Sequence, residues 1–415
     1  MEDVHRKKFP FWATLVALVV FMGSFALDQY ALGATRKNIA EYYKVIENQE
    51  KISDDVLVTE ADLKEIDRCQ KAASENANQT EECVRTFYDQ YTMEHGVEKA
   101  FAHLARLQKE HPNLLPSCHY ISHGIGHAAL RLNGKDPYKT FTAMQSEGLY
   151  RNIVTCGNGY FHGVIEEVAK NITDKDELVK VLRSVCNSDK ISNNAGNCFH
   201  GIGHAAMIKT DYSVDDMLYV CDRVSARRQD IFGCDTGGFM EYAQIFGDAV
   251  RVHDKKMVFT LCDSLETKYQ PACYLEHSSF FEAYAKDRRD YTENIGYCRQ
   301  IENDLNRMSC VKLFAIRAVR LAHFKDIYDM CLNTSSRYER VMCTAVIADR
   351  VGGSMDSSRT SGDYRSAVRV VCGTLNPLYE NYCDDLVFKH REHLFYTSAS
   401  DLQLYTGWPL FSIVK

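Results

Sequence analysis

Apolar positions recur along the chain every three or four residues, with polar positions between them, which is the spacing of amphipathic helices. Residues 177–186 are an example, because their large apolar side chains recur three or four positions apart and the segment ends at Cys186. A second kind of helical segment starts at a cysteine, as at residues 273–285. The pattern therefore predicts an all-α chain in which one helix ends near a cysteine and the next begins at another.

The 16 cysteines follow this helical pattern. The second cysteine of each pair, together with Cys118 and Cys156, recurs every 33 to 42 residues, a period typical of a helical solenoid. Seven pairs are separated by 11 to 14 residues: Cys69 with Cys83, Cys186 with Cys198, Cys221 with Cys234, Cys262 with Cys273, Cys298 with Cys310, Cys331 with Cys343, and Cys372 with Cys383.

Geometry favours a local disulfide within each pair. Twelve residues of straight helix span about 18 Å, whereas a disulfide needs Cα atoms about 4.4–6.8 Å apart. The chain must therefore reverse between the two cysteines, so that each disulfide would hold a helix–turn–helix unit together. Pairing across repeats is the alternative. Cys118 and Cys156 are left over, either as a disulfide with each other or as free thiolates.

A two-helix unit of this period resembles tetratricopeptide-like and Sel1-like solenoids in general form. The expected fold is a disulfide-stapled, all-α solenoid over residues 61–394, with a helical stalk at 28–60 and a C-terminal tail at 395–415. Such arrays commonly present extended binding surfaces.

The N-terminus predicts the compartment. Residues 9–27 carry no charge and are long enough to span a bilayer, and the basic residues before them predict a cytoplasmic tail at residues 1–8. A single-pass signal anchor is the preferred interpretation, and a cleaved signal peptide is the alternative. Either places the rest of the chain in an exoplasmic, oxidising space. Asn78, Asn171 and Asn333 begin possible glycosylation sequons there.

Composition narrows the function further. The chain is 45% hydrophobic and 25% charged, which is typical of a globular protein. Its net charge of −7 argues against a nucleic-acid partner. The sequence contains no phosphate-binding loop, dinucleotide fingerprint or Cys-x-x-Cys motif.

Histidines concentrate in three consecutive units that share the pattern His-Gly-x-x-His/Glu. Residues four apart lie on one face of a helix, which makes three candidate chelating pairs: His123 with His127, His162 with Glu166, and His200 with His204. Each pair flanks a glycine, although glycine costs about 1 kcal/mol in a helix. This cost indicates either close approach of two helices or space beside the histidine.

Neighbouring helices lie about 8–10 Å apart, so that these six side chains can meet in one groove. They would suit one six-coordinate ion or a dinuclear pair, with Glu166 as a bridging or acid–base carboxylate. Mixed His and carboxylate ligands favour Zn, Fe, Mn or Cu. Cys118, His119 and Cys156 are additional candidate ligands. Deoxyhypusine hydroxylase resembles this design in taking metal ligands from successive helical repeats, but through adjacent His-Glu dipeptides.

Two functions follow from these features. The first is a membrane-anchored exoplasmic metalloprotein, acting as an oxidoreductase or a hydrolase. The second is a non-enzymatic scaffold that binds a protein or glycan partner, in which the His-Gly motifs are packing elements.

Overall fold

The computed structural model describes residues 56–72, 77–111, 118–143, 156, 158–251, 258–283, 291–321, 330–355, 362–375 and 377–397. Every regular element in these ranges is helical, which confirms the predicted all-α class. None of the described helices combines the length and apolar character needed to cross a bilayer. The predicted anchor and cytoplasmic tail, nearly all of the stalk, and the C-terminal tail from residue 398 lie outside the described residues.

The described helices follow one another along the chain. In chain order they are α2 (Glu60–Ala72), α3 (Ala77–His95), α4 (Val97–Glu110), α5 (Cys118–Leu132), α6 (Pro137–Ala143), α8 (Gly159–Ala169), α9 (Lys175–Cys186), η1 (Asp189–Asn194), α10 (Ala195–Lys209), α11 (Val214–Val224), α12 (Arg228–Arg251), α13 (Thr260–Ser264), α14 (Gln270–His277), η3 (Ser278–Ala283), α15 (Tyr291–Cys298), α16 (Asp304–Leu321), α18 (Arg337–Met355), α19 (Gly362–Cys372), α20 (Pro377–Lys389) and α21 (Glu392–Phe395).

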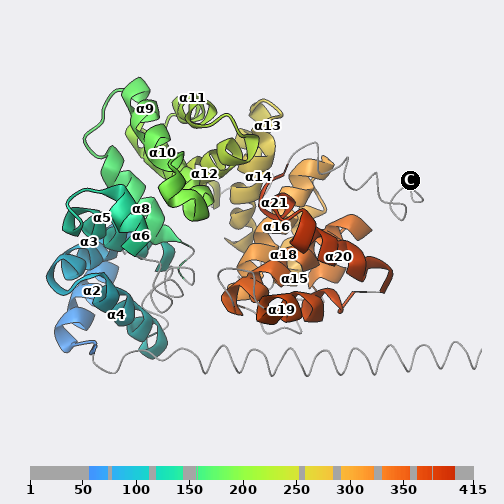
Figure 1. Cartoon of the computed structure of the whole chain (residues 1–415), viewed down its shortest axis with the longest axis horizontal. Coiled ribbons are helices and arrows are strands. Elements are labelled where there is room, and N and C mark those ends of the chain that lie inside the picture. Colours follow the sequence, from blue (N-terminus) through green and yellow to red (C-terminus); the bar gives the residue numbers. More distant parts are fainter. Residues whose placement is uncertain are drawn as a thin grey trace, which may run out of the picture.

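One set of helices packs in chain order. Helix α5 lies between α3 and α8, and α10 lies between α8 and α12. The same order continues through α14, α16 and α18, while α9 and α11 pack against each other beside this row. Figure 1 shows the resulting arc, from α2–α4 in blue, through α9–α12 in green, to α15–α21 in orange and red.

Local sequence explains where α9 and α11, the two helices beside this row, begin, and which face of α9 is buried. Asp174 precedes α9, and its side chain accepts a hydrogen bond from the Glu177 amide. Ser213 caps α11 in the same way through the Asp216 amide. Each such cap stabilises a helix by about 1 kcal/mol. Helix α9 then buries Leu178 and its other core residues on one face.

The disulfides confirm the predicted local pairing, and the alternative of pairing across repeats is wrong for these seven pairs. All seven are bonded, with Cα atoms 5.4–5.7 Å apart. The bonds join Cys69 to Cys83, Cys186 to Cys198, Cys221 to Cys234, Cys262 to Cys273, Cys298 to Cys310, Cys331 to Cys343, and Cys372 to Cys383.

The two leftover cysteines also form a disulfide. Cys118 and Cys156 are bonded to each other, with Cα atoms 5.2 Å apart. All 16 cysteines are therefore paired, and no free cysteine remains. The hypothesis that Cys118 and Cys156 supply metal ligands is wrong, because a disulfide sulfur is not the thiolate that a metal site requires.

The glycines of the motif allow helix backbones to touch. A Cβ at Gly163 of α8 would overlap the backbone carbonyl of His123 on α5. A Cβ at Gly203 of α10 would overlap the carbonyl of Cys234 on α12. The first of the two explanations for these glycines, close approach of helices, is thus the one that the structure shows.

The last described residues fold back onto α16. Lys312 of α16 is fully buried, and its ammonium donates to the carbonyls of His393 and Tyr396 at 2.6 and 3.0 Å. A third hydrogen bond, of 3.0 Å, reaches Thr397 Oγ1. The Tyr396 ring also meets Phe232 of α12 edge to face. Residues 393–397 are therefore part of the core.

Candidate metal centre

Four neighbouring helices carry the polar cluster that the sequence highlights. Helix α5 contributes His119, His123 and His127, which lie one turn apart. Helices α8 and α10 add two candidate ligands each, His162 with Glu166 and His200 with His204. Helix α12 lies on the far side of α10 and supplies Thr236 and Glu241.

Four imidazoles from three helices meet at one point. One ring nitrogen from each of His119, His123, His162 and His204 lies within 4.8 Å of the other three. The ring centroids of these histidines are 5.0–6.1 Å apart. His123 and His204 are 0% exposed and His162 is 2% exposed, so water has little access to them.

Three ring nitrogens of these histidines have no hydrogen-bond partner among the described residues. They are His123 Nε2, His162 Nδ1 and His204 Nε2. Buried polar side-chain atoms almost always have a partner, since leaving one unsatisfied costs about 1–3 kcal/mol. Three such nitrogens, on rings that meet at one point, form a set that could bind one ligand together.

A second layer of groups fixes the orientation of these rings. His123 Nδ1 donates to Glu166 Oε1 at 2.8 Å, and His204 Nδ1 donates to Glu241 Oε2 at 2.9 Å. His119 Nδ1 donates to the carbonyl of Cys156 at 3.1 Å. A proton on Nδ1 leaves the lone pair on Nε2, the arrangement that metal-binding histidines usually show.

The two carboxylates are themselves held in place. His127 Nε2 donates to Glu166 Oε2 at 2.9 Å, and the Arg85 guanidinium of α3 lies 3.6 Å from the same oxygen. The Tyr120 hydroxyl donates to both oxygens of Glu241 at 2.6 and 2.5 Å. The ring of Tyr120 also stacks on His123, with centroids 4.9 Å apart.

Burial and neighbouring charges set the protonation states. Burial lowers the pKa of His123 and of His162. The pKa of His162 is lowered well below its usual value, because the neighbouring imidazoles also disfavour a second positive charge there. Burial alone would raise the pKa of Glu166, but His123 and His127 hold it well below its usual range. Neutral imidazoles beside an ionised carboxylate are the state that a metal ion requires.

The structure separates the predicted ligands into two groups. His123, His162 and His204 meet at the centre, together with His119, which the sequence marks as an additional candidate. His127 and Glu166 bond to each other one layer outward. His200 lies beside His162, with ring centroids 4.7 Å apart, and its Nδ1 bonds to Thr236 Oγ1. Each i, i+4 pair therefore divides between the centre and its surroundings.

Sequence reasoning missed Glu241 and Tyr120. The signal that could identify Glu241 is the Gly-Gly-x-x-Glu segment at 237–241, which keeps the glycine and carboxylate of the motif without its histidines. Tyr120 has no such signal, since it lies 121 residues from its partner.

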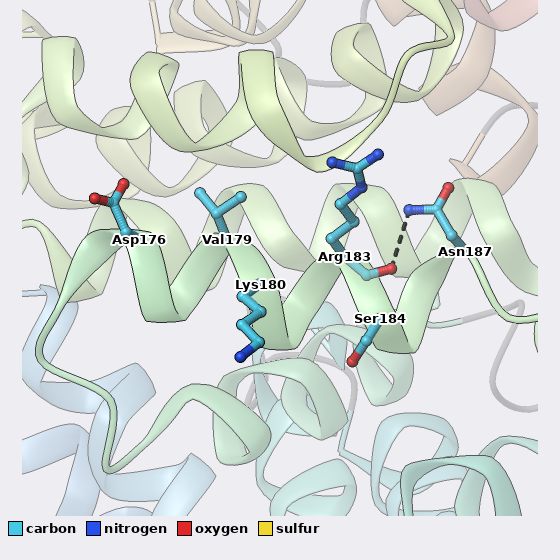
Figure 2. A pocket seen from close by; sticks show the side chains of 6 residues that line it. All are labelled: Asp176, Val179, Lys180, Arg183, Ser184 and Asn187. Carbon is cyan, nitrogen blue, oxygen red and sulfur yellow. Dashed lines mark hydrogen bonds between the residues drawn. The ribbon is translucent and has the colours of Figure 1, made fainter.

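Outside this cluster, other polar groups in the described part of the chain converge less well. Figure 2 shows a surface hollow on α9, lined by Asp176, Val179, Lys180, Arg183, Ser184 and Asn187. The only side-chain bond drawn there is from Asn187 to the Arg183 carbonyl, so that no set of groups faces one point. The cluster Cys262, Cys273 and His277 includes two disulfide sulfurs.

The three sequons differ in their surroundings. Asn171 is exposed in the turn after α8, which suits an attached glycan. Asn333 accepts a hydrogen bond of 2.7 Å from Arg299 through its side chain. Asn78 lies in α3, and its side chain is outside the described part.

The chain was compared with protein-family models, with curated proteins and with solved structures. None of the three comparisons found a match.

Proposed function

We propose that this chain is an exoplasmic metalloprotein, anchored by residues 9–27, that binds one transition-metal ion through His119, His123, His162 and His204. The observation that carries the proposal is the convergence of four imidazoles, three of which carry a buried nitrogen without any partner among the described residues. If these side chains only filled the space between the helices, apolar residues could do the same without burying polar nitrogens. Imidazoles whose outer nitrogens bond to carboxylates are the arrangement of a metal site.

The spacing of the nitrogens fits a single ion. Metal–nitrogen bonds of about 2.0–2.1 Å in a tetrahedron place the nitrogens about 3.3 Å apart. Separations of up to 4.8 Å therefore require side-chain movements of less than about 1 Å. Four protein ligands complete a tetrahedral shell, whereas a hydrolytic zinc site keeps one position open. The geometry thus supports ion retention or electron transfer more than hydrolysis.

Ligand type and charge narrow the choice of metal. Neutral imidazoles suit Zn, Cu and Fe, and they suit Mn less well. Two carboxylates, Glu166 and Glu241, sit one layer out and can balance the charge of a divalent ion. We therefore expect the site to bind zinc or copper in preference to iron.

A second candidate function is a non-enzymatic scaffold for a protein or glycan partner. The packing of α3, α5, α8, α10 and α12 in chain order supports a repeat solenoid, and such arrays present extended surfaces. In that case the histidines would be structural, and their removal would lower stability without affecting any bound metal.

Elemental analysis and metal titration of the full-length oxidised chain test the proposal. We expect one equivalent of Zn or Cu, retained against a competing chelator, and loss of that equivalent in a double variant with His162→Ala and His204→Ala. His277→Ala is the matched control, because His277 is equally buried but lies outside the four-imidazole centre. A wild-type chain that takes up neither Zn, Cu nor Fe would refute metal binding and favour the scaffold.

A further inference from the structure

One disulfide differs from the other seven. Cys118–Cys156 spans 38 residues, and the others span 11 to 14. It joins the first residue of α5 to the residue three positions before α8. These two helices carry three of the four central imidazoles, so that this bond links two successive ligand-bearing units.

This disulfide lies directly against one ligand. Cys118 immediately precedes His119, and the carbonyl of Cys156 accepts the hydrogen bond from His119 Nδ1. Both ends of the disulfide therefore fix the same imidazole. The start of α8 also packs closely against α5, since a Cβ at Gly159 would overlap the backbone carbonyl of His119.

The disulfide is also partly accessible. Cys118 is half-buried, whereas Cys156 is 4% exposed. Of the other cysteines only Cys83 is half-buried, and its disulfide to Cys69 joins α2 to α3, which carry none of the four central histidines. Cys118 is therefore the end of this disulfide that a thiol reagent would reach more readily, and exposed disulfides are in general the more easily reduced ones.

We propose that Cys118–Cys156 is a redox modification site for dithiols, and that its state controls how tightly the metal is held. This inference rests on the proposed function. One thiolate of the dithiol attacks Cys118 Sγ, forms a mixed disulfide and releases Cys156 as a thiolate, which takes up a proton. The second thiol of the reagent then displaces Cys118, so that the dithiol leaves as a disulfide and two electrons and two protons have been transferred to the protein.

Opening the bond acts on the metal through His119. The carbonyl that orients this ring is no longer covalently tied to α5, so that His119 loses its fixed position while the other three imidazoles keep theirs. Loss of an outer-shell partner typically weakens metal binding about 10- to 100-fold. The reduced protein should therefore release its ion to a chelator that the oxidised protein resists.

The test uses the full-length chain loaded with Zn²⁺ or Co²⁺. A double variant with Cys118→Ser and Cys156→Ser should bind both ions about 10- to 100-fold more weakly and show an altered Co²⁺ absorption spectrum. A double variant with Cys372→Ser and Cys383→Ser is the matched control, since it removes a disulfide between α19 and α20, far along the chain from the centre. Its Co²⁺ spectrum and affinity should equal those of the wild type.

A second measurement covers the case in which the serine variant does not fold. The wild type is treated with a dithiol while its helical circular dichroism is followed, and the opened cysteines are identified by alkylation. Opening of Cys118–Cys156 should weaken zinc binding, and reoxidation should restore it. His119→Ala should show the weakened affinity already, and reduction should lower it no further.

The outcomes distinguish this inference from the function on which it rests. Unchanged or tighter zinc binding after Cys118–Cys156 opens would overturn the redox control and leave metal binding intact. The same conclusion would follow if reduction weakened zinc binding equally in His119→Ala. A wild-type oxidised chain without any metal affinity would instead refute the metal centre itself.

Discussion

The substitution Gly203→Ala tests whether backbone contact between α10 and α12 supports both the fold and the centre. The added Cβ would lie 2.9 Å from the carbonyl carbon of Gly237 and closer still to the Cys234 carbonyl oxygen. Non-bonded carbon atoms prefer separations of about 3.5–4.0 Å. The two helices would therefore have to separate by at least about 0.6 Å, and more to accommodate the oxygen.

The obstructing atoms belong to the backbone, so that no side-chain rotation can relieve the overlap. Overpacking a well-packed core typically costs about 1–3 kcal/mol, and we expect the upper end of this range for Gly203→Ala. The neighbouring residue His204 bonds to Glu241 on α12, so that separation of the helices should also weaken zinc binding.

Gly196→Ala is the matched control on the same helix, because a Cβ there meets nothing within 4 Å. Alanine is favoured over glycine in helices by up to about 1 kcal/mol, so this variant should be as stable as the wild type or more so. Urea unfolding of the oxidised, metal-free chain measures both. A Gly203→Ala variant with the same urea midpoint as Gly196→Ala would refute the backbone-contact argument.

Three further predictions concern charge and protonation. Glu241→Gln removes the carboxylate that orients His204 and should weaken zinc binding about 10- to 100-fold in a chelator competition. Burial lowers the pKa of His123 and His162, so the unfolded chain binds their protons more readily than the folded chain as the pH falls below about 6.5. The metal-free protein should therefore lose up to about 1.4 kcal/mol of stability per imidazole for each pH unit until the lowered pKa is reached. A double variant with His123→Gln and His162→Gln whose stability falls as steeply would contradict this. Burial raises the pKa of Glu276 from 4.5 to about 7, so the stability it provides in acid is lost as the pH rises through that value. Glu276→Gln should therefore gain about 3 kcal/mol relative to the wild type between pH 4.5 and 8 in urea unfolding, and a constant difference would show that the carboxyl group is not buried as described.

The sequence predicted the helical hairpins because their cause is local. Two cysteines about 12 residues apart can bond only if the chain reverses between them, and this holds whatever surrounds them. The glycines beside the histidines likewise carry a local cost that only a close contact explains. The bond between Cys118 and Cys156 could not be predicted in this way, because a separation of 38 residues does not restrict the path of the chain between them.

The centre was only partly predictable. Spacing placed His123 and His127 on one face of α5, but it does not determine which of them faces the neighbouring helices. That choice depends on the rotation of α5 against α8 and on the partner that each ring finds. Glu166 draws His127 outward, and Glu241 of α12 fixes His204. Such partners lie 37 to 43 residues away in the sequence, beyond any helical periodicity.

Lys312 makes the fold sensitive to truncation before residue 393. Its ammonium donates to three acceptors in residues 393–397, and leaving a buried donor unsatisfied costs about 1–3 kcal/mol, and more for a charged group. A chain cut short before residue 393, by a stop codon or a protease, would therefore lose more than a few surface residues. It would remove three acceptors from a buried ammonium, so affinity tags and truncations should leave this segment intact.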